Sequence, residues 1–477
     1  MDPTPYRLVQ PGEYELQNHF YPRVPNAQLH PLVRFFLQLG NARILARYCH
    51  LHPEVDPVAL ERVFATPPRY FRWAGSDLFH VTDERGQRRF VVIETNSSPS
   101  GQKSMPLLDP YMEDGGYRML VERTFVPLMK RRKLPRGDLA VLWDKNWKEV
   151  SGYAAVIADV VGEPVHLVQV TDGSDAVRFD DGVLHVEVDG VWTPIRAAFR
   201  YVTQRPWTRL PPLTRTAMLN PVIACLAGGR NKSLAATAYD LYNAELASTG
   251  LAIRVPETFP NVGLPELPMH VERMGGIAIV KVPYANAGQG VEPIVDADDL
   301  QRWMETDHHY DRFLVQGLIG NTGWSSRTRD GKLFHVGTLP TKNGRMFVAD
   351  LRFMIGAGPE GFYPLALYAR RAPAPLAREL KDSPHTAWEM LGTNLSKKRA
   401  DGSFTTEPDR LMLMDSRDFN QLGIGLDDLV EAYVQTALAT TAIDKMAQRL
   451  VTQKQRFRKR LFRSLVADDT LMEELCS

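Results

Sequence analysis

Apolar residues near the N-terminus recur close to the spacing of an α-helix. The members of this pattern are Leu32, Phe35, Phe36, Leu39 and Ile44. Side chains three or four positions apart share one helix face, so the pattern predicts a mostly helical opening stretch with one apolar side.

Two extended runs follow, from Leu78 to Val81 and from Arg89 to Glu94. The turn-forming residues from Asp83 to Gly86 separate them, and this combination predicts a β-hairpin. The second run leads directly into the polar segment from Ile93 to Gly101, which carries the candidate chemistry of this part of the chain.

The pattern changes after Gly137. An apolar strand from Leu139 to Trp143, a helix from Trp147 to Val161 and a second strand from His166 to Val170 follow in order. This βαβ order predicts a small parallel sheet. Turn residues at 180–182 and 189–190 then predict hairpins before a strand from Ile195 to Tyr201.

Prolines at 206, 211 and 212 predict an extended connector and a domain boundary near residue 220. Beyond it we expect a strand from Ile277 to Val282, further strands of an antiparallel sheet at Phe313 to Gly317 and Phe347 to Ile355, and helix from Leu426 onward. The chain is thereby divided into an N-terminal module (1–135), a βαβ substrate domain (136–219), a nucleotide-binding body (220–450) and a basic C-terminal helix (451–477).

Composition narrows the class of protein without naming a partner. The 477 residues hold 57 Lys+Arg and 56 Asp+Glu, a net charge of +1, and 44% are hydrophobic. These values exclude a disordered chain and an overall field that attracts nucleic acid or membranes. Three widely spaced cysteines exclude a disulfide framework. No stretch approaches the roughly 18 apolar residues of a membrane helix, so the expected compartment is the cytoplasm.

Glu94 and Asn96 are the first candidate site residues. Side chains two positions apart on a strand point to the same face, so both oxygens can approach one ion. Mg²⁺ prefers oxygen ligands and commonly takes one or two carboxylates together with substrate phosphates. The alternative is a strand end with a solvated glutamate and an asparagine that begins a turn at Ser97-Ser98-Pro99.

The loop after Lys281 is the second candidate. Its residues from Ala285 to Gly290 include Asn286, Gly288 and Gly290, which are small enough for backbone amides to approach phosphate oxygens. Lys281 would add a point charge at the mouth of the loop. The loop lacks the third glycine of a dinucleotide fingerprint and the ending of a P-loop, and its alternative is a plain hairpin turn.

The order of these pieces resembles the ATP-grasp superfamily, in particular its circularly permuted, glutathione-synthetase-like branch. The matching pieces are the motif at Ile93 to Ser98, the βαβ domain, the arginine strand Phe199-Arg200-Tyr201, the stretch from Asn220 to Lys232, the glycine loop and the strand from Leu314 to Gly317. The resemblance covers roughly residues 75 to 425. It implies an α+β fold of antiparallel sheets flanked by helices, with a βαβ substrate domain and a helical tail.

The resemblance also implies roles for individual residues. Phosphates of ATP would contact Lys232, Lys281, the loop residues Asn286, Gly288 and Gly290, and a late loop with Asn394 and either Lys397 or Lys398. Adenine would face Val315 and Gln316. Metal would be held by Glu94 and Asn96, with Asp350 as a third ligand, while Arg352 takes phosphate. Arg200 would clamp the substrate carboxylate, and Ser97, Ser98, Ser100 and Gln204 are candidate substrate contacts.

One alternative metal site stays open. Unpermuted members carry their metal acids near the C-terminal end of the domain, and Asp415, Asp418 and Asn420 are similar to that arrangement. The motif at Glu94 is preferred because its E-x-N-S-S-P run is closer to the metal motif of the superfamily.

The implied function is an ATP-dependent carboxylate-amine ligase with ATP and Mg²⁺ as cofactors. It would form an amide or peptide bond through an acyl phosphate, as in peptide biosynthesis, with a small carboxylate and an amine as substrates and no membrane partner; a homodimer is compatible. The alternatives are a phosphotransferase on the same scaffold and a non-catalytic nucleotide- or RNA-binding protein.

The basic tail at 454–463 is the only hint of nucleic-acid binding. The preferred interpretation is a helix in which Phe457, Leu461 and Phe462 pack on the body while the arginines stay in solvent. Nucleic acid is therefore not an expected partner.

Overall fold

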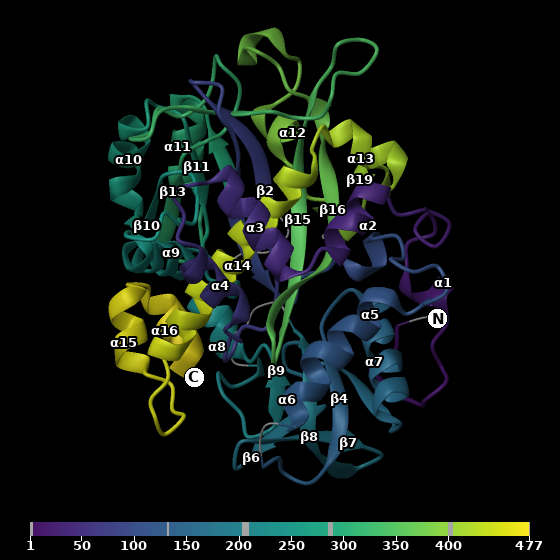
Figure 1. Ribbon diagram of the computed structural model, residues 1–477. Helices are drawn as coiled ribbons and strands as arrows, with labels where there is room; N and C mark the ends of the chain where they lie inside the picture. The colour runs from purple at the N-terminus through teal and green to yellow at the C-terminus, as the bar shows by residue number, and fades with distance from the viewer. Residues whose placement is uncertain (1–2, 131–132, 203–208, 285–289, 399–403, 477) are drawn as a thin grey trace.

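The computed structural model describes residues 3–130, 133–202, 209–284, 290–398 and 404–476, with backbone alone at 396–398, 404–406 and 476. Its helices and strands form a mixed α+β structure (Figure 1), and the predicted fold class is confirmed. In these ranges the strands group into three larger sheets and one two-stranded pair, β17 (Ser396–Lys398) with β18 (Phe404–Thr406).

The central sheet contains the predicted hairpin. β2 (Trp73–Asp83) pairs antiparallel with β3 (Arg88–Ser97) on one edge and with β15 (Phe347–Gly358) and β14 (Leu333–His335) on the other. β15 continues to β16 (Gly361–Pro375) and β19 (Leu411–Met412). Strands that are far apart in the sequence thus share one ladder. The N-terminal motif and the late Asp350 segment are thereby placed in the same sheet.

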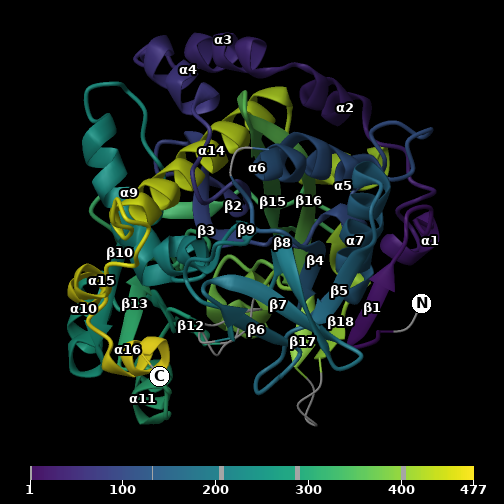
Figure 2. The same ribbon diagram turned by 90° about the horizontal axis from the view of Figure 1, so that it is seen from below.

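The long helix α14 (Leu426–Arg449) packs across this sheet. Its alternation of alanine and larger apolar residues gives close contact with β3, β15 and α9 (Lys232–Leu246). Helices α2 (Pro31–Gln38), α3 (Asn41–Leu51) and α4 (Pro57–Ala65) cover its outer side (Figure 2). Gly40, with φ +73°, ends one helix and begins the next, so the predicted helical stretch is two helices.

The predicted βαβ unit is confirmed. β4 (Asp138–Trp143) and β5 (Val165–Gln169) are parallel and α7 (Trp147–Val161) connects them. Parallel strands β8 (Val191–Tyr201) and β9 (Ala217–Leu219) extend this sheet, while β1 (Tyr6–Val9), β6 (Val177–Asp180) and β7 (Val183–Val188) complete it. The two predicted hairpin turns join β6 to β7 and β7 to β8.

A separate four-stranded sheet forms a lobe with its own small core. The strand order is β10 (Thr258–Gly263), β13 (Arg312–Gln316), β11 (Ala278–Lys281) and β12 (Val291–Ile294), all antiparallel. Helices α10 (Leu267–Arg273) and α11 (Ala297–Glu305) supply apolar residues to this core. The strands at 313–317 and 347–355, expected in one antiparallel sheet, therefore lie in two different sheets.

The remaining helices fill the faces and edges of these sheets. They are α1 (Leu16–His19), α5 (Gly115–Leu120), α6 (Val126–Lys130), α8 (Val222–Ala224), α12 (Ala387–Leu391), α13 (Ser416–Leu422), α15 (Lys459–Leu465) and α16 (Asp469–Cys476). Among the described residues, none of the helices is long and apolar enough to cross a membrane.

The tail is not one basic helix. After α14 the chain turns at Gln455 and forms a bridge between Val451 and Phe457 before α15 and α16 begin. Phe462 is fully buried and Phe457 lies in edge-to-face contact with it at 5.4 Å. The expected packing of the tail aromatics on the body is therefore confirmed, although the helix is shorter than predicted.

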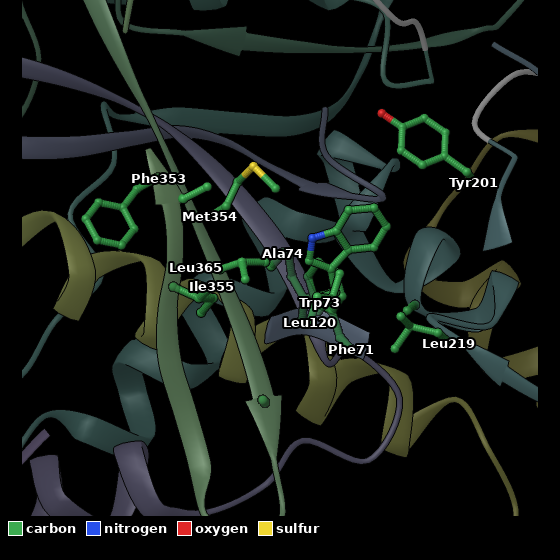
Figure 3. Close-up of a cluster of buried hydrophobic side chains, with 14 of the residues drawn as sticks. Phe71, Trp73, Ala74, Leu120, Tyr201, Leu219, Phe353, Met354, Ile355 and Leu365 are labelled. Carbon is green, nitrogen blue, oxygen red and sulfur yellow. The ribbon is translucent and has the colours of Figure 1, made fainter. Parts of the chain in front are cut away.

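One large core joins the βαβ sheet to the central sheet. Trp73 lies among Leu120, Leu219 and Leu365, and its ring centroid is 5.1 Å from that of Phe199 (Figure 3). The proposed division into four domains remains a prediction, but this core and the pairing of β2 with β15 show that the N-terminal module shares its packing with both later parts.

Candidate active site

A cleft of about 1130 Å³ opens between the lobe, the central sheet and the carboxyl edge of the βαβ sheet. Its lining carries these lysines, arginines and acids: Asp77, Glu94, Lys103, Lys145, Asp172, Arg230, Lys232, Lys281, Asp307, Asp350, Arg352, Arg370 and Glu474. Basic side chains concentrated in one cleft favour a multiply charged anion as ligand.

Most of the predicted site residues meet in this one cleft. Those on its lining are Glu94, Asn96, Ser98, Ser100, Lys232, Lys281, Gly290, Gln316, Asp350, Arg352 and Asn394. They come from segments that are far apart in the sequence. Asn286, Gly288 and Gln204 lie outside the described residues, as do the side chains of Lys397 and Lys398.

Glu94 and Asn96 lie near the end of β3, and a bulge helps to orient them. Asp77 pairs with Glu94 while Leu78 pairs with Val92, so Ile93 is an extra residue on β3. A bulge twists its strand and re-aims the side chains beside it, and both Ile93 and Glu94 line the cleft. The Lys232 Nζ atom lies 4.0 Å from the Glu94 carboxylate.

Asn96 is less available than Glu94. Its Oδ1 atom accepts a hydrogen bond from Arg230 at 3.0 Å, and its buried Nδ2 atom has no hydrogen-bond partner among the described residues. The Arg230 guanidinium also donates to the backbone carbonyl of Ser97 at 2.9 Å. Arg230 thus binds the turn after β3 and places a cation beside Glu94.

Lys281 and Lys232 reach the cleft from two different elements, strand β11 of the lobe and helix α9. The Lys281 Nζ atom donates to Gln316 Oε1 at 2.6 Å, and the Gln316 amide donates to Thr258 at 2.8 Å, which fixes the lysine over the lobe sheet. Burial lowers the pKa of Lys281 to about 8, against the opposing charge of Glu94. Lys232 is the first residue of α9, whose N-cap is Asn231.

Two acids and two arginines form a buried network on the floor of the cleft. Arg352 donates two hydrogen bonds to Asp77, both at 2.6 Å, and Arg370 joins Asp77, at 3.0 Å, to Asp350. Burial works to raise the pKa of Asp77, but the two arginines outweigh it and lower that pKa to about 2. Paired charges of this kind hold both guanidinium planes in a fixed orientation.

This network changes the role expected for Asp350. Its carboxylate accepts from Arg370 and from the Thr393 hydroxyl, the latter at 2.9 Å, and the side chain is buried. These contacts engage both oxygens, so they do not support Asp350 as a metal ligand. Asn394 lies beside the network, 3.5 Å from Arg370.

Three of the predicted site residues are not on the cleft lining: Arg200, Ser97 and Val315. The Arg200 guanidinium is buried and donates to the backbone carbonyls of Asn220, at 2.5 Å, and Val202. Ser97 contacts Cys225 Sγ at 3.0 Å, and Val315 lies in the small core of the lobe. Strand alternation explains Val315, because Gln316 takes the cleft side of β13.

The alternative metal acids serve a helix terminus. Asp415 accepts from the Asp418 backbone at 2.8 Å as the N-cap of α13, and Asp418 pairs with Arg23 at 3.1 Å. Asn420 donates to the Ser416 carbonyl at 2.7 Å. Local capping therefore accounts for this cluster.

Glu94 is the acid that fits a metal best. It is partly exposed to the cleft, and Mg²⁺ commonly binds one or two carboxylates plus phosphate oxygens. No group of three or more His, Cys, Asp or Glu side chains that could hold an ion occurs in the described part of the chain. The residues thus fit an ion held by Glu94 and a bound phosphate, and they do not fit a closed protein site.

Sequence reasoning missed several cations and acids of the cleft. Asp77, Lys103, Lys145, Arg230 and Arg370 all line it. Arg230 lies two positions before Lys232, and Asp77 lies opposite Glu94 in the hairpin. The motifs around Lys232 and Glu94 could therefore have indicated both residues. Arg370 and Lys145 carry no local signal in the sequence.

Comparison with known proteins adds distant likenesses in fold. No family model and no curated protein matches the chain. A glutathione synthetase-like effector from Globodera pallida aligns with 9% identity over 73% of this chain and 86% of its own, with a TM-score of 0.39. A RimK domain ATP-grasp protein from Sphaerobacter thermophilus aligns with 14% identity over 51% and 93%, with a TM-score of 0.28.

At these identities and TM-scores, neither structure carries an argument about the function of this chain. The functional argument therefore rests on the residues of the cleft.

Proposed function

We propose that this protein is an ATP-dependent ligase that joins a carboxylate to an amine. The observation that supports this function is the convergence of Lys232, Lys281 and Arg352 around the partly exposed carboxylate of Glu94 in one cleft. A triphosphate with its cation needs this combination of several fixed positive charges and one available acid.

The adenine would occupy the apolar end of the cleft beside Gln316. Apolar side chains on the cleft lining are Ile93, Ile279, Val282, Pro293, Ile319 and Leu391, and Ile279 lies opposite Gln316 on the neighbouring strand. The phosphates would extend from there toward Lys281, Lys232 and Arg352. An apolar slot followed by converging cations separates the base from the phosphates in the way a nucleotide requires.

Mg²⁺, bound at Glu94 and the phosphate oxygens, would neutralise charge on the transferring phosphoryl group. The side chains do the rest by position and charge. Asp77 holds Arg352 and Arg370 rigid, and Lys281 and Lys232 fix the phosphates, so the protein needs little reorganisation as charge develops.

The reaction would proceed in two displacements. An oxygen of the substrate carboxylate attacks the γ-phosphorus, the bond to the β-γ bridging oxygen breaks, and ADP leaves with an acyl phosphate formed. The amine nitrogen then attacks the acyl carbon, inorganic phosphate leaves with the electron pair of the broken bond, and the nitrogen loses a proton to form the amide.

The test is release of ADP and phosphate by the full chain with ATP, Mg²⁺ and panels of carboxylates and amines. We expect release that requires both an acid and an amine. Glu94→Gln and Lys281→Met should lower turnover by about 100-fold or more, because each removes a charge that contacts the triphosphate.

Lys342→Met is the matched control, since Lys342 is exposed and is not on the cleft lining; it should turn over normally. Wild-type turnover by both cleft variants contradicts the proposal. A stable phosphoester formed without amine identifies the phosphotransferase instead.

A further inference from the structure

The carboxyl edge of the parallel strands forms a second region of the cleft. Lys145 and Asn146 follow β4, Asp172 follows β5, and Tyr201 ends β8; all four line the cleft. Open parallel sheets commonly bind ligands at this edge, where strand ends and helix N-termini meet. The triphosphate assignment above uses none of these residues.

Lys145 lies at this edge among other cationic side chains. Among the residues that the structure describes, no hydrogen bond or ion pair joins its ammonium to another side chain. Asp144, the acid next to it in the sequence, is buried and paired with Arg209 at 3.2 Å. Burial and the charges of Arg230, Arg352 and Lys103 lower the pKa of Lys145 to about 8. An unpaired lysine among other cations is stabilised by a bound anion.

A second lysine is held in place beside it. Lys103 is buried, its Nζ atom donates to Asn146 Oδ1 at 3.2 Å, and the Asn146 amide donates to the Tyr201 hydroxyl at 3.1 Å. Glu149, in the first turn of α7, lies 3.8 Å from the Lys103 ammonium. The carboxyl edge therefore holds the Lys103 ammonium in a fixed position through neighbouring side chains.

Charge indicates the class of ligand. Lys103 is balanced by Glu149, whereas the charge of Lys145 is not balanced by any ion pair in the described ranges. Asp172 is exposed at the rim. Of the two lysines at this edge only Lys145 lacks a paired acid in the described ranges, and its single positive charge suits one carboxylate better than a phosphate, which carries more charge.

The volume of the cleft is large enough for a second ligand. The cleft of about 1130 Å³ exceeds the roughly 300–1000 Å³ typical of a pocket for one small molecule. There is room for a nucleotide and an amino-acid-sized molecule together.

We propose that Lys145, together with Lys103, which is oriented through Asn146 and Tyr201, binds a carboxylate group of the second ligand, an amino acid or short peptide. The proposal deepens the ligase function and rests on it. It also replaces Arg200, whose guanidinium is engaged by backbone carbonyls, as the anchor for substrate carboxylate.

Competitive labelling tests the proposal without need for turnover. The full chain is treated with trace acetic anhydride at pH 7.5, and acetylation of each lysine is measured by peptide mass spectrometry. Competitors are AMP-PNP with Mg²⁺, the twenty amino acids, their glycyl dipeptides, and the corresponding α-amides. Lys145 and Lys281, whose pKa values are lowered to about 8, keep an uncharged, reactive fraction at this pH, and the exposed Lys342 serves as the reference lysine.

We expect AMP-PNP to protect Lys281 and leave Lys145 reactive. At least one amino acid or dipeptide should protect Lys145 about fivefold or more, while its amide does not, because an amide lacks the charge that the lysine binds. Lys103→Met should raise the concentration needed for that protection by about 10-fold or more. Lys148→Met, on α7 but not on the cleft lining, should leave it unchanged.

Three results overturn the proposal: no competitor with a carboxylate protects Lys145, amides protect it equally, or AMP-PNP protects it. Failure of AMP-PNP to protect Lys281 instead counts against the ATP-dependent function. The two failures are therefore distinguishable in one experiment.

Discussion

At the scale of single residues, the cleft is defined by whether each charge has a fixed partner. Arg352 and Arg370 are locked by Asp77, whereas Lys281 is buried and donates its hydrogen bond to the neutral side chain of Gln316. A locked arginine contributes rigid geometry to a site. A buried lysine without a paired acid costs stability until its ligand binds.

Lys281→Met should stabilise the ligand-free protein at pH 7 by about 1–2 kcal/mol. The pKa of Lys281 is about 8 in the fold against about 10.5 unfolded, so below pH 8 folding disfavours the charged form. This cost disappears as pH rises from 8 to 10.5, and the two proteins should then converge. Thermal unfolding at pH 7 and at pH 10 measures the effect.

Lys342→Met, which replaces an exposed lysine away from the cleft lining, is the matched control. A Lys281→Met protein that is less stable than wild type by the same amount at both pH values contradicts the argument, because the hydrogen bond to Gln316 would then outweigh the desolvation of the charge.

At the scale of elements, the loop between β3 and α5 is positioned by a helix from another sheet. Glu149, fully buried in α7, accepts from the backbone amides of Gly101 at 2.8 Å and Gln102 at 3.0 Å, and from the Ser100 hydroxyl at 2.7 Å. It thereby caps the short helix Gln102–Ser104 and sets Ser100 and Lys103 on the cleft lining. The βαβ unit and the central sheet are coupled at this carboxylate.

Glu149→Gln should loosen this loop and weaken binding at the carboxyl edge. A neutral amide accepts weaker hydrogen bonds than a carboxylate, and its NH2 group can face a backbone N–H donor. The expected cost in stability is about 1–3 kcal/mol. Hydrogen exchange of residues 100–104 should accelerate by about 10-fold or more, while exchange in the lobe stays unchanged.

Asp159→Asn, near the other end of the same helix, serves as the control and should leave exchange at 100–104 as in wild type. If hydrogen exchange of the loop is unchanged in Glu149→Gln, the other contacts of the loop suffice to hold it. The positioning role proposed for Glu149 is then wrong.

At the scale of the whole molecule, the largest of the four buried hydrophobic clusters in the described residues and the small cluster of the lobe indicate two units of stability. The large core joins the central and βαβ sheets through Trp73, while the lobe depends on a small core around Trp303 and Phe313, whose rings are 5.8 Å apart. A lobe with few buried residues should open at lower free energy than the body.

Paired substitutions separate the two units. Trp73→Ala should cost about 3–5 kcal/mol and accelerate hydrogen exchange in β4, β8 and β15 together. Trp303→Ala should accelerate exchange in β10 to β13 and leave the body protected. Global acceleration by both variants contradicts the existence of a separate lobe.

Particular residues show how far sequence reasoning reached. The period of two at Glu94 and Asn96 predicts a shared face, and both side chains line the cleft, as does Lys281 at the end of its strand. The bulge at Ile93 and the engagement of Arg200 and Asp350 were not visible, since each depends on a partner outside the local segment.

By itself the sequence determined local structure: the hairpin, the βαβ unit, the turns and the polar motif at the end of β3 all follow from patterns within short, continuous segments. Only the tertiary structure decided which charges remain available to a ligand. Availability depends on long-range pairing, such as Asp77 with Arg352 and Glu149 with the Ser100 loop, and side-chain periodicity carries no information about the partner that a distant strand supplies.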